Sequence, residues 1–163
     1  MKILSARICL LVVCLVAFSM ISVRAVGMGA DDDIAIVVNP SNAVSNLTVA
    51  ELRKIYTGER QYWKSSSPVI LLMRSQGAPE RDVILRVVYQ MSEDQYTQYW
   101  VAKVMRAEAS DPPVSLFSHG IVQEGIKGNA GAIGYVRANE VRPGVKVLRV
   151  AGLLPGQPGY PLH

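Results

Sequence analysis

The sequence predicts an α/β domain in which helices cover both faces of one sheet. Short apolar runs rich in β-branched residues, at positions 34–39, 69–73 and 132–136, are typical of buried strands. Amphipathic segments with helix-start signals lie between these runs, and alternating strands and helices favour a layered sheet. The chain has 163 residues, of which 50% are hydrophobic and 18% are charged, so it suits one hydrophobic core and excludes a disordered chain.

The first 25 residues are typical of a secretory signal. Lys2 and Arg7 precede an uncharged run from position 8 to 21, and Val23 and Ala25 occupy the positions that signal peptidase reads. An uncleaved membrane anchor fits less well, because 14 apolar residues span about 21 Å against a hydrocarbon core of about 30 Å. We therefore expect cleavage after Ala25 and a periplasmic protein that meets the membrane only during export.

Removal of this signal changes the composition. Cys9 and Cys14 both lie inside it, so the mature chain has no thiol and no disulfide. A lipid anchor at Cys14 is not expected, because a bulky Val13 precedes it and the apolar run continues beyond it. Three of the 17 Lys and Arg residues leave with the signal, so 14 remain against 13 Asp and Glu, a net charge of +1. That balance excludes a nucleic-acid-binding surface of the usual strongly basic kind.

The mature chain begins with a leader, residues 26–33, that ends in three aspartates and is expected to be solvated. The strand at 34–39 stops before a proline. Thr48 and Glu51 have the spacing of a capping box, which predicts a short helix through Tyr56 that Gly58 ends.

After the strand at 69–73, Pro79 marks the first position of a helix that carries apolar residues at helical spacing through residue 91. Ser92 and Gln95 form a second capping box, which opens a helix with Tyr96, Trp100 and Val104 on one face.

Residues 111–113 are expected to be a linker, and a fourth helix ends at Gly128. Two strands, at 132–136 and 145–150, close the domain, so its expected bounds are 34–152. The tail at 153–163 is rich in proline and glycine and is expected to be flexible.

Enzymatic chemistry has little support in the sequence. The mature chain has two histidines and no cysteine, and His119, at the start of a helix, is expected to have a capping or surface role. No metal-binding or nucleotide-binding motif is present, so we expect no cofactor and no metal. The glycines at 125, 128, 131 and 134 are expected to serve a helix end and close backbone packing.

One constellation has a physical argument for binding. A buried strand runs into Arg74, Ser75, Gln76 and Gly77, and a helix begins just beyond them. Free N–H groups at a helix start attract an anion, Arg74 can add charge-assisted hydrogen bonds, and Gly77 permits close approach of the backbone. The same residues also fit an ordinary strand-to-helix loop with a solvated arginine, and local sequence favours that interpretation because helix starts are common and mostly empty.

Three stretches in order resemble the phosphate-binding proteins of bacterial ABC transporters, in the type 2 periplasmic binding-protein superfamily. They are residues 38–63, with Asn39-Pro40 and Val44-Ser45-Asn46-Leu47-Thr48; residues 69–81, which are similar to the second strand and phosphate loop; and Asn129-Ala130-Gly131-Ala132-Ile133-Gly134-Tyr135-Val136. The resemblance spans about residues 34–150 and implies a mixed sheet, a phosphate or oxyanion ligand and a transporter partner.

Two departures from that family pattern shape the expected function. Ala78, Pro79 and Glu80 stand where the family's phosphate loop has Ser-Gly-Thr, which removes two hydroxyls and places a carboxylate in the turn. The family's proteins close two lobes on their ligand, whereas this chain resembles a single lobe. We therefore expect weak oxyanion binding through Arg74 to Gly77. The alternative is a ligand-free lobe that docks on an envelope transporter, a sensor or a second copy of itself.

Overall fold

The computed structural model describes residues 32–163, and the expected signal and most of the leader lie outside them. The main sheet has five strands in the order β4-β3-β5-β1-β6, and β2 and β7 pair separately. The elements in chain order are β1 Ile34–Val38, β2 Asn46–Leu47, α2 Val49–Tyr56, β3 Ile70–Arg74, α3 Pro79–Val83, the π-helix η2 Ile84–Tyr89, α4 Glu93–Met105, β4 Val114–Leu116, α5 His119–Gly128, β5 Ala132–Arg137, the 3₁₀ turn η3 Ala138–Glu140, β6 Lys146–Val147 and β7 Arg149–Val150.

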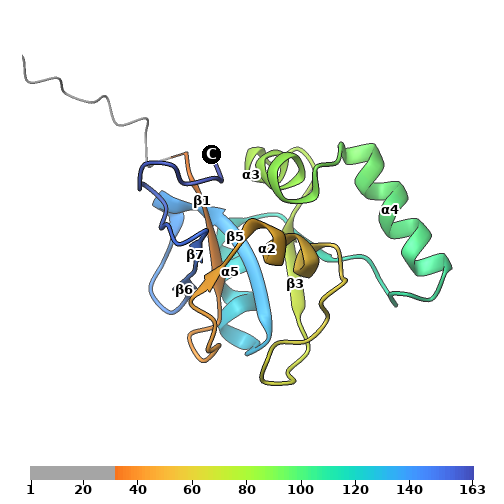
Figure 1. The fold of residues 1–163 in the computed structure, drawn as a ribbon, viewed down its shortest axis with the longest axis horizontal. Helices are drawn as coiled ribbons and strands as arrows, with labels where there is room; N and C mark the ends of the chain where they lie inside the picture. Colours follow the sequence, from red (N-terminus) through yellow and green to blue (C-terminus); the bar gives the residue numbers. More distant parts are fainter. Residues whose placement is uncertain (1–31) are drawn as a thin grey trace, which may run out of the picture.

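The sheet is mixed, as expected. Strands β3, β4 and β5 run parallel to one another, while β1 is antiparallel to both β5 and β6. Parallel neighbours need crossover connections, which α3, η2, α4 and α5 supply. The carboxyl ends of three strands consequently meet at one edge of the sheet (Figure 1).

Helices cover both faces of the sheet. Alternate residues of β1 point to opposite faces and pack against different helices. Ile34, Ile36 and Val38 belong to the larger core, together with side chains of α2, η2 and α4. Ala35 and Val37 belong to a smaller core that α5 covers. Strand β1 is therefore buried from both sides along its whole length.

The predicted helix starts are confirmed at both capping boxes. The Thr48 hydroxyl accepts the Glu51 backbone N–H at 3.1 Å, and Glu51 in turn accepts the Thr48 N–H at 2.9 Å. Ser92 and Gln95 make the same reciprocal pair at the start of α4. The helix that starts at Pro79 is a short α-helix continued by a π-helix, and Gln90, in the left-handed conformation, ends it.

The strand expected at 145–150 is two short strands rather than one. Successive N–H groups of an extended chain point to opposite sides. The Leu148 N–H donates to Ile36 of β1, and the Arg149 N–H donates to Ser45 beside β2. The segment therefore leaves the main sheet at Leu148 and joins β2. Strands β2 and β4 were not predicted.

The carboxyl-terminal tail is packed, which corrects the expectation of a flexible segment. Leu162 is fully buried and Tyr160 nearly so. The Leu162 carbonyl accepts the Ile34 N–H at 2.8 Å, and the Tyr160 hydroxyl donates to the Ile34 carbonyl at 2.7 Å. Two apolar anchors thus outweigh the local tendency of proline and glycine to loosen the chain.

The end of the leader is also packed. Asp33 is buried, and its carboxylate accepts the Gly156 N–H at 2.6 Å. Asp32 is exposed, and the rest of the leader lies outside the described residues. Within residues 32–163, no helix combines the length and apolar character that a membrane crossing requires.

Candidate functional site

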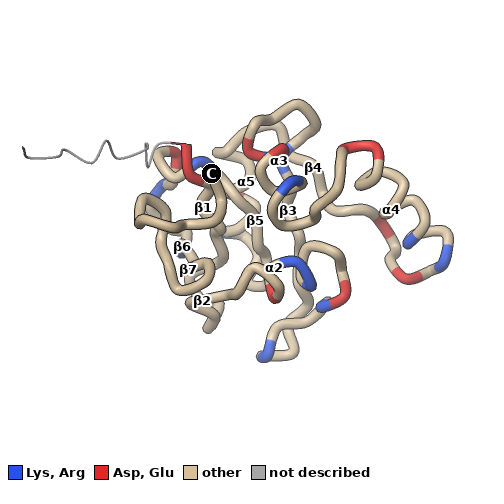
Figure 2. The backbone as a smooth tube through the Cα atoms, turned by 45° about the horizontal axis from the view of Figure 1, so that its top comes forward, with Lys and Arg blue, Asp and Glu red and all other residues tan. Residues whose placement is uncertain are grey.

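The carboxyl edge of the sheet gathers charged residues from distant parts of the chain. Arg74 ends β3, Arg137 ends β5, and His119 begins α5, whose positive end therefore faces the same edge. In open α/β sheets, ligands bind in the crevice outside the carboxyl ends of the strands. Figure 2 shows basic and acidic positions side by side near α3 at this edge.

Arg74 is held firmly by the strands around it. One guanidinium nitrogen donates to the carbonyl of Leu116, the last residue of β4, at 3.0 Å. The Arg74 backbone N–H donates to the Tyr135 hydroxyl at 3.0 Å. Its Nε is buried and has no hydrogen-bond partner among the described residues, although the side chain is 11% exposed. One strong donor of Arg74 is thus left without a hydrogen bond to any of the described residues.

The carboxylate of Glu80 lies at the centre of this arrangement, at 1% exposure. Its Oε1 contacts His119 Nε2 and lies 3.7 Å from Arg74 Nε and 3.6 Å from Arg137 Nε. Both arginine distances are ion-pair distances without a hydrogen bond. The other oxygen, Oε2, is buried without a partner among the described residues. Arg74, Glu80, His119 and Arg137 are called the Glu80 cluster below.

The charges of the cluster favour an ionised Glu80. Burial alone would raise the pKa of this carboxyl group, because it disfavours the charged form. The N–H of its own peptide, the His119 imidazole and the Arg74 charge outweigh burial and hold the pKa below its ordinary value of 4.5. Two arginines then face one carboxylate, so the cluster keeps an excess of positive charge.

His119 is buried, which corrects the expectation of a capping or surface role. Ser118 caps α5 instead, since its hydroxyl accepts the Ile121 N–H at 3.2 Å. The His119 ring lies between two carboxylates, with Nε2 on Glu80 and Nδ1 3.9 Å from Glu140 Oε2. The sequence signal that could have indicated a role for His119 at the site was its position as the first residue of a helix.

Of the four residues predicted to bind a ligand, only Arg74 belongs to the cluster. Ser75 follows it and donates its N–H to the Leu116 carbonyl at 3.0 Å. Gln76 and Gly77 form an exposed turn, in which Gly77 has a φ of +82° that favours glycine. Ligand binding by these four residues stays a prediction. Arg137, which directly follows the predicted strand at 132–136, was missed.

Arg81 holds the end of β3 in position through hydrogen bonds and an ion pair. One of its guanidinium nitrogens donates to the Arg74 carbonyl at 2.8 Å, and the others pair with Glu93. The guanidinium also lies 4.5 Å from the centre of the Tyr96 ring. Its contacts are therefore internal, and it fixes the end of β3 relative to the start of α4.

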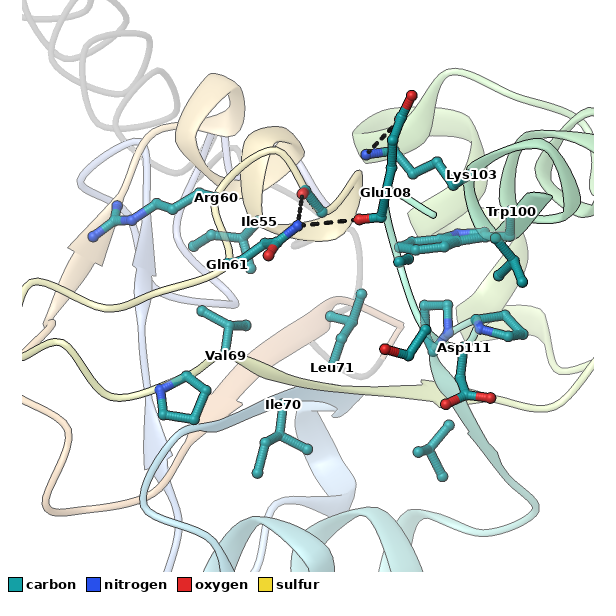
Figure 3. Close-up of a pocket in the computed structure, with 18 of the residues that line it drawn as sticks. Ile55, Arg60, Gln61, Val69, Ile70, Leu71, Trp100, Lys103, Glu108 and Asp111 are labelled. Carbon is teal, nitrogen blue, oxygen red and sulfur yellow. Dashed lines mark hydrogen bonds and ion pairs between the residues drawn. The ribbon is translucent and has the colours of Figure 1, made fainter. Parts of the chain in front are cut away.

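A second feature is a groove of about 810 Å³ between α4 and the starting half of β3. Figure 3 shows Trp100 and Leu71 facing into it, with Gln61 and the ion pair of Lys103 and Glu108 at its rim. The Gln61 amide donates to the Glu108 carbonyl at 3.4 Å. Among residues 32–163, no three His, Cys, Asp or Glu side chains gather as metal ligands would.

Comparison with known proteins identifies the fold. A family model described as a PBP superfamily domain matches residues 29–153. A search of curated proteins finds no significant match.

Solved structures agree with the family match. One is a protein from Clostridium perfringens described as a phosphate ABC transporter substrate-binding protein with bound phosphate, 24% identical, with a TM-score of 0.62. Another is an ABC-type phosphate transport receptor from Vibrio cholerae, 22% identical, also with a TM-score of 0.62. The alignments cover 76% of this chain but 47% and 48% of those chains. The chain thus matches about half the length of these proteins, and at this identity the likeness shows the fold alone.

Proposed function

The chain belongs to the PBP superfamily, and on that premise we propose that it is a solute-binding protein for a small oxyanion, with phosphate as the first candidate. The ligand would bind at the Glu80 cluster, with Arg74 as its main contact and the loop from Ser75 to Gly77 beside it. Binding rather than catalysis is proposed, because the solved structures with this fold are described as binding proteins or transport receptors.

A single observation carries this proposal. Two arginines and a histidine, from β3, β5 and α5, surround one point at the carboxyl edge, and that point already holds a carboxylate. Guanidinium groups recognise carboxylates and phosphates by the same planar, charge-assisted geometry. The unpartnered Nε of Arg74 supplies a donor that a ligand oxygen could satisfy.

We expect the affinity to be low, with a dissociation constant of about 1 mM, equivalent to about 4 kcal/mol of binding free energy. The reason is that the Glu80 carboxylate occupies the centre of the cluster and repels a second anion. The family pattern's two loop hydroxyls are also replaced here by Ala78 and Glu80.

Calorimetric titration of residues 26–163 with phosphate and with sulfate tests the proposal. Arg74→Ala and Arg137→Ala should each weaken the binding of phosphate. Arg149→Ala is the matched control, because Arg149 is exposed and donates to the Gly152 carbonyl in another part of the fold. Absence of heat at about 10 mM phosphate, or equal heat from wild type and Arg74→Ala, would refute oxyanion binding at this site.

Location and partner form part of the same proposal. The signal-like start supports export to the periplasm, and the phosphate-transport relatives support an envelope ABC transporter as partner. Cell fractionation with an antibody to the chain tests the first point. Recovery of the protein in the cytosol with its first 25 residues intact would contradict export.

A ligand-free interaction module is the second candidate function. Helix α4 stands apart from the sheet (Figure 1). It exposes Val101 and Met105, the latter at 83%. An apolar hollow of about 410 Å³ lies between this helix and Pro112 and Pro113. Sedimentation and affinity capture from envelope extracts, with Met105→Asp as the variant, test whether this surface binds a transporter, a sensor or a second copy.

A further inference from the structure

We propose that Glu80 is a built-in competitor of the oxyanion ligand: its carboxylate occupies the ligand position and must leave it before an oxyanion can bind. The inference rests on the proposed oxyanion function and adds the residue that regulates the same site. It makes Glu80 the residue that sets the affinity, whereas Arg74 and Arg137 supply the attraction.

The position of the carboxylate is the first argument. Oε1 of Glu80 lies within 4 Å of side chains from β3, β5 and α5, namely those of Arg74, Arg137 and His119. A ligand oxygen attracted by the same three side chains would have to occupy the same space. Simultaneous binding would also place two anions in contact in a buried site, which is strongly unfavourable.

The incomplete fit of the carboxylate is the second argument. Neither arginine makes a hydrogen bond to Glu80, since both Nε atoms lie more than 3.5 Å from Oε1. Within residues 32–163, Oε2 of Glu80 and Nε of Arg74 are buried without hydrogen-bond partners. A tetrahedral oxyanion carries more oxygens than one carboxylate and could satisfy donors that Glu80 leaves unpaired.

The place of Glu80 in the chain allows it to leave. It lies on the first turn of α3, which begins two residues after the exposed turn formed by Gln76 and Gly77. Pro79 and Asp82 on the same helix are exposed, so solvent lies within one helical turn of the carboxylate. Rotation of the side chain, without unfolding of β3 or β5, would vacate the cluster.

Glu80→Gln is the decisive variant, because glutamine keeps the size and shape of the side chain and removes its charge. We expect it to bind phosphate roughly tenfold more tightly than wild type in calorimetry. Glu80→Asp keeps the charge and should stay weak. Adding Arg74→Ala to Glu80→Gln should abolish the gain, which ties the gain to this site.

Glu140→Gln is the matched control. Glu140 also faces His119, at 3.9 Å, but its carboxylate is 44% exposed and makes no ion pair with either arginine among the described residues. Its removal changes the net charge by the same amount and should leave phosphate affinity unchanged. An equal gain in both variants would show a general charge effect and overturn the competitor role.

The two proposals fail in different ways. Weak binding by wild type and tighter binding by Glu80→Gln support both. Binding by wild type with no gain in Glu80→Gln overturns the competitor role and leaves the oxyanion function. Binding by Glu80→Gln alone, with none by wild type at about 10 mM phosphate, supports the competitor role and overturns the function of the native chain. Binding by neither overturns both.

A measurement on the wild-type chain covers the case in which Glu80→Gln does not fold. Phosphate is titrated while the side-chain carboxyl carbon of Glu80 and the imidazole nitrogens of His119 are followed by NMR. The Glu80 and His119 signals should shift together, with one dissociation constant for phosphate, as the Glu80 carboxylate leaves the cluster. The guanidinium signals of Arg74 are followed in the same titration. A shift of these signals with no change in the Glu80 carboxyl signal would overturn the competitor role.

Discussion

Arg81 and Glu93 form a two-pronged ion pair, with Nε donating to Oε2 at 2.8 Å and an Nη donating to Oε1 at 2.7 Å. The pair joins α3 to the start of α4, 12 residues further along the chain. Because Arg81 also donates to the carbonyl of Arg74, the pair links the position of α4 to the end of β3. The end of β3, which carries Arg74 of the Glu80 cluster, is thus braced by internal contacts.

Removal of this ion pair should destabilise the fold. Glu93→Gln leaves the Arg81 guanidinium, 4% exposed, without its counter-charge, so we expect a loss of about 2 kcal/mol in the free energy of unfolding. Urea denaturation measures it. Glu124→Gln is the control, since its ion pair with Lys127 is exposed and should contribute less than about 0.5 kcal/mol. Equal losses in the two variants would contradict the bracing role.

Close packing at Gly131 gives a second prediction. A Cβ at this position would run into the carbonyl oxygen of Pro68, and the Gly131 carbonyl accepts the Trp63 indole N–H at 2.9 Å. Gly131→Ala must therefore displace backbone, and we expect a loss of about 3 kcal/mol in the free energy of unfolding. Denaturant unfolding, followed by the fluorescence of the two buried tryptophans, Trp63 and Trp100, measures it.

Gly128 supplies the matched control for that substitution. It ends α5, and an added Cβ would meet no atom of residues 32–163 within 4 Å. Gly128→Ala should leave the free energy of unfolding unchanged or raise it by up to about 1 kcal/mol, because alanine favours the helix. If Gly131→Ala were as stable as Gly128→Ala, close approach of Pro68 would not be the reason for glycine at 131.

Local chemistry explains which parts of the fold could be predicted. Thr48 with Glu51, and Ser92 with Gln95, fixed two helix starts because a capping box is complete within four residues. Strand β4 escaped prediction because its three residues follow two prolines and become a strand only by pairing with β3.

Local sequence likewise predicted only part of the candidate site. Arg74 was predicted because a strand, a loop and a helix start follow one another along the chain. His119 and Arg137 lie 45 and 63 residues further on, and they reach Arg74 only because β3 lies between β4 and β5. The strand order is a property of the whole sheet, which no local pattern records.

The packed tail gives a third prediction. Leu162 is fully buried in the larger core, so Leu162→Ala should lower the free energy of unfolding by about 3 kcal/mol. Pro158→Ala, in the exposed part of the tail, should change it by less than about 0.5 kcal/mol. Thermal unfolding of the two variants measures the difference. Matching melting temperatures would mean that the tail does not contribute to the core in solution.

The pH dependence of stability tests the ionised state of Glu80. Its pKa lies below 4.5 in the folded chain because the hydrogen bonds and positive charges of the cluster outweigh its burial. A carboxyl group with a lowered folded-state pKa adds stability that is fully present above the unfolded value and is lost as the pH falls through the folded value. Wild type should therefore lose more stability than Glu80→Gln on acidification from about pH 5 to about pH 3.

Urea unfolding at several pH values within that window measures the two slopes. Glu51 and Glu108 also have lowered pKa values, Glu51 through hydrogen bonds from Thr48 and Glu108 through its hydrogen bond from Arg106. Both remain in wild type and in Glu80→Gln, so the difference between the slopes belongs to Glu80. Parallel curves would mean that the ionised carboxylate of Glu80 is not stabilised by its surroundings, and the cluster would then lack the attraction that an oxyanion needs. A steeper loss in wild type would show that the cluster stabilises an anion at this position.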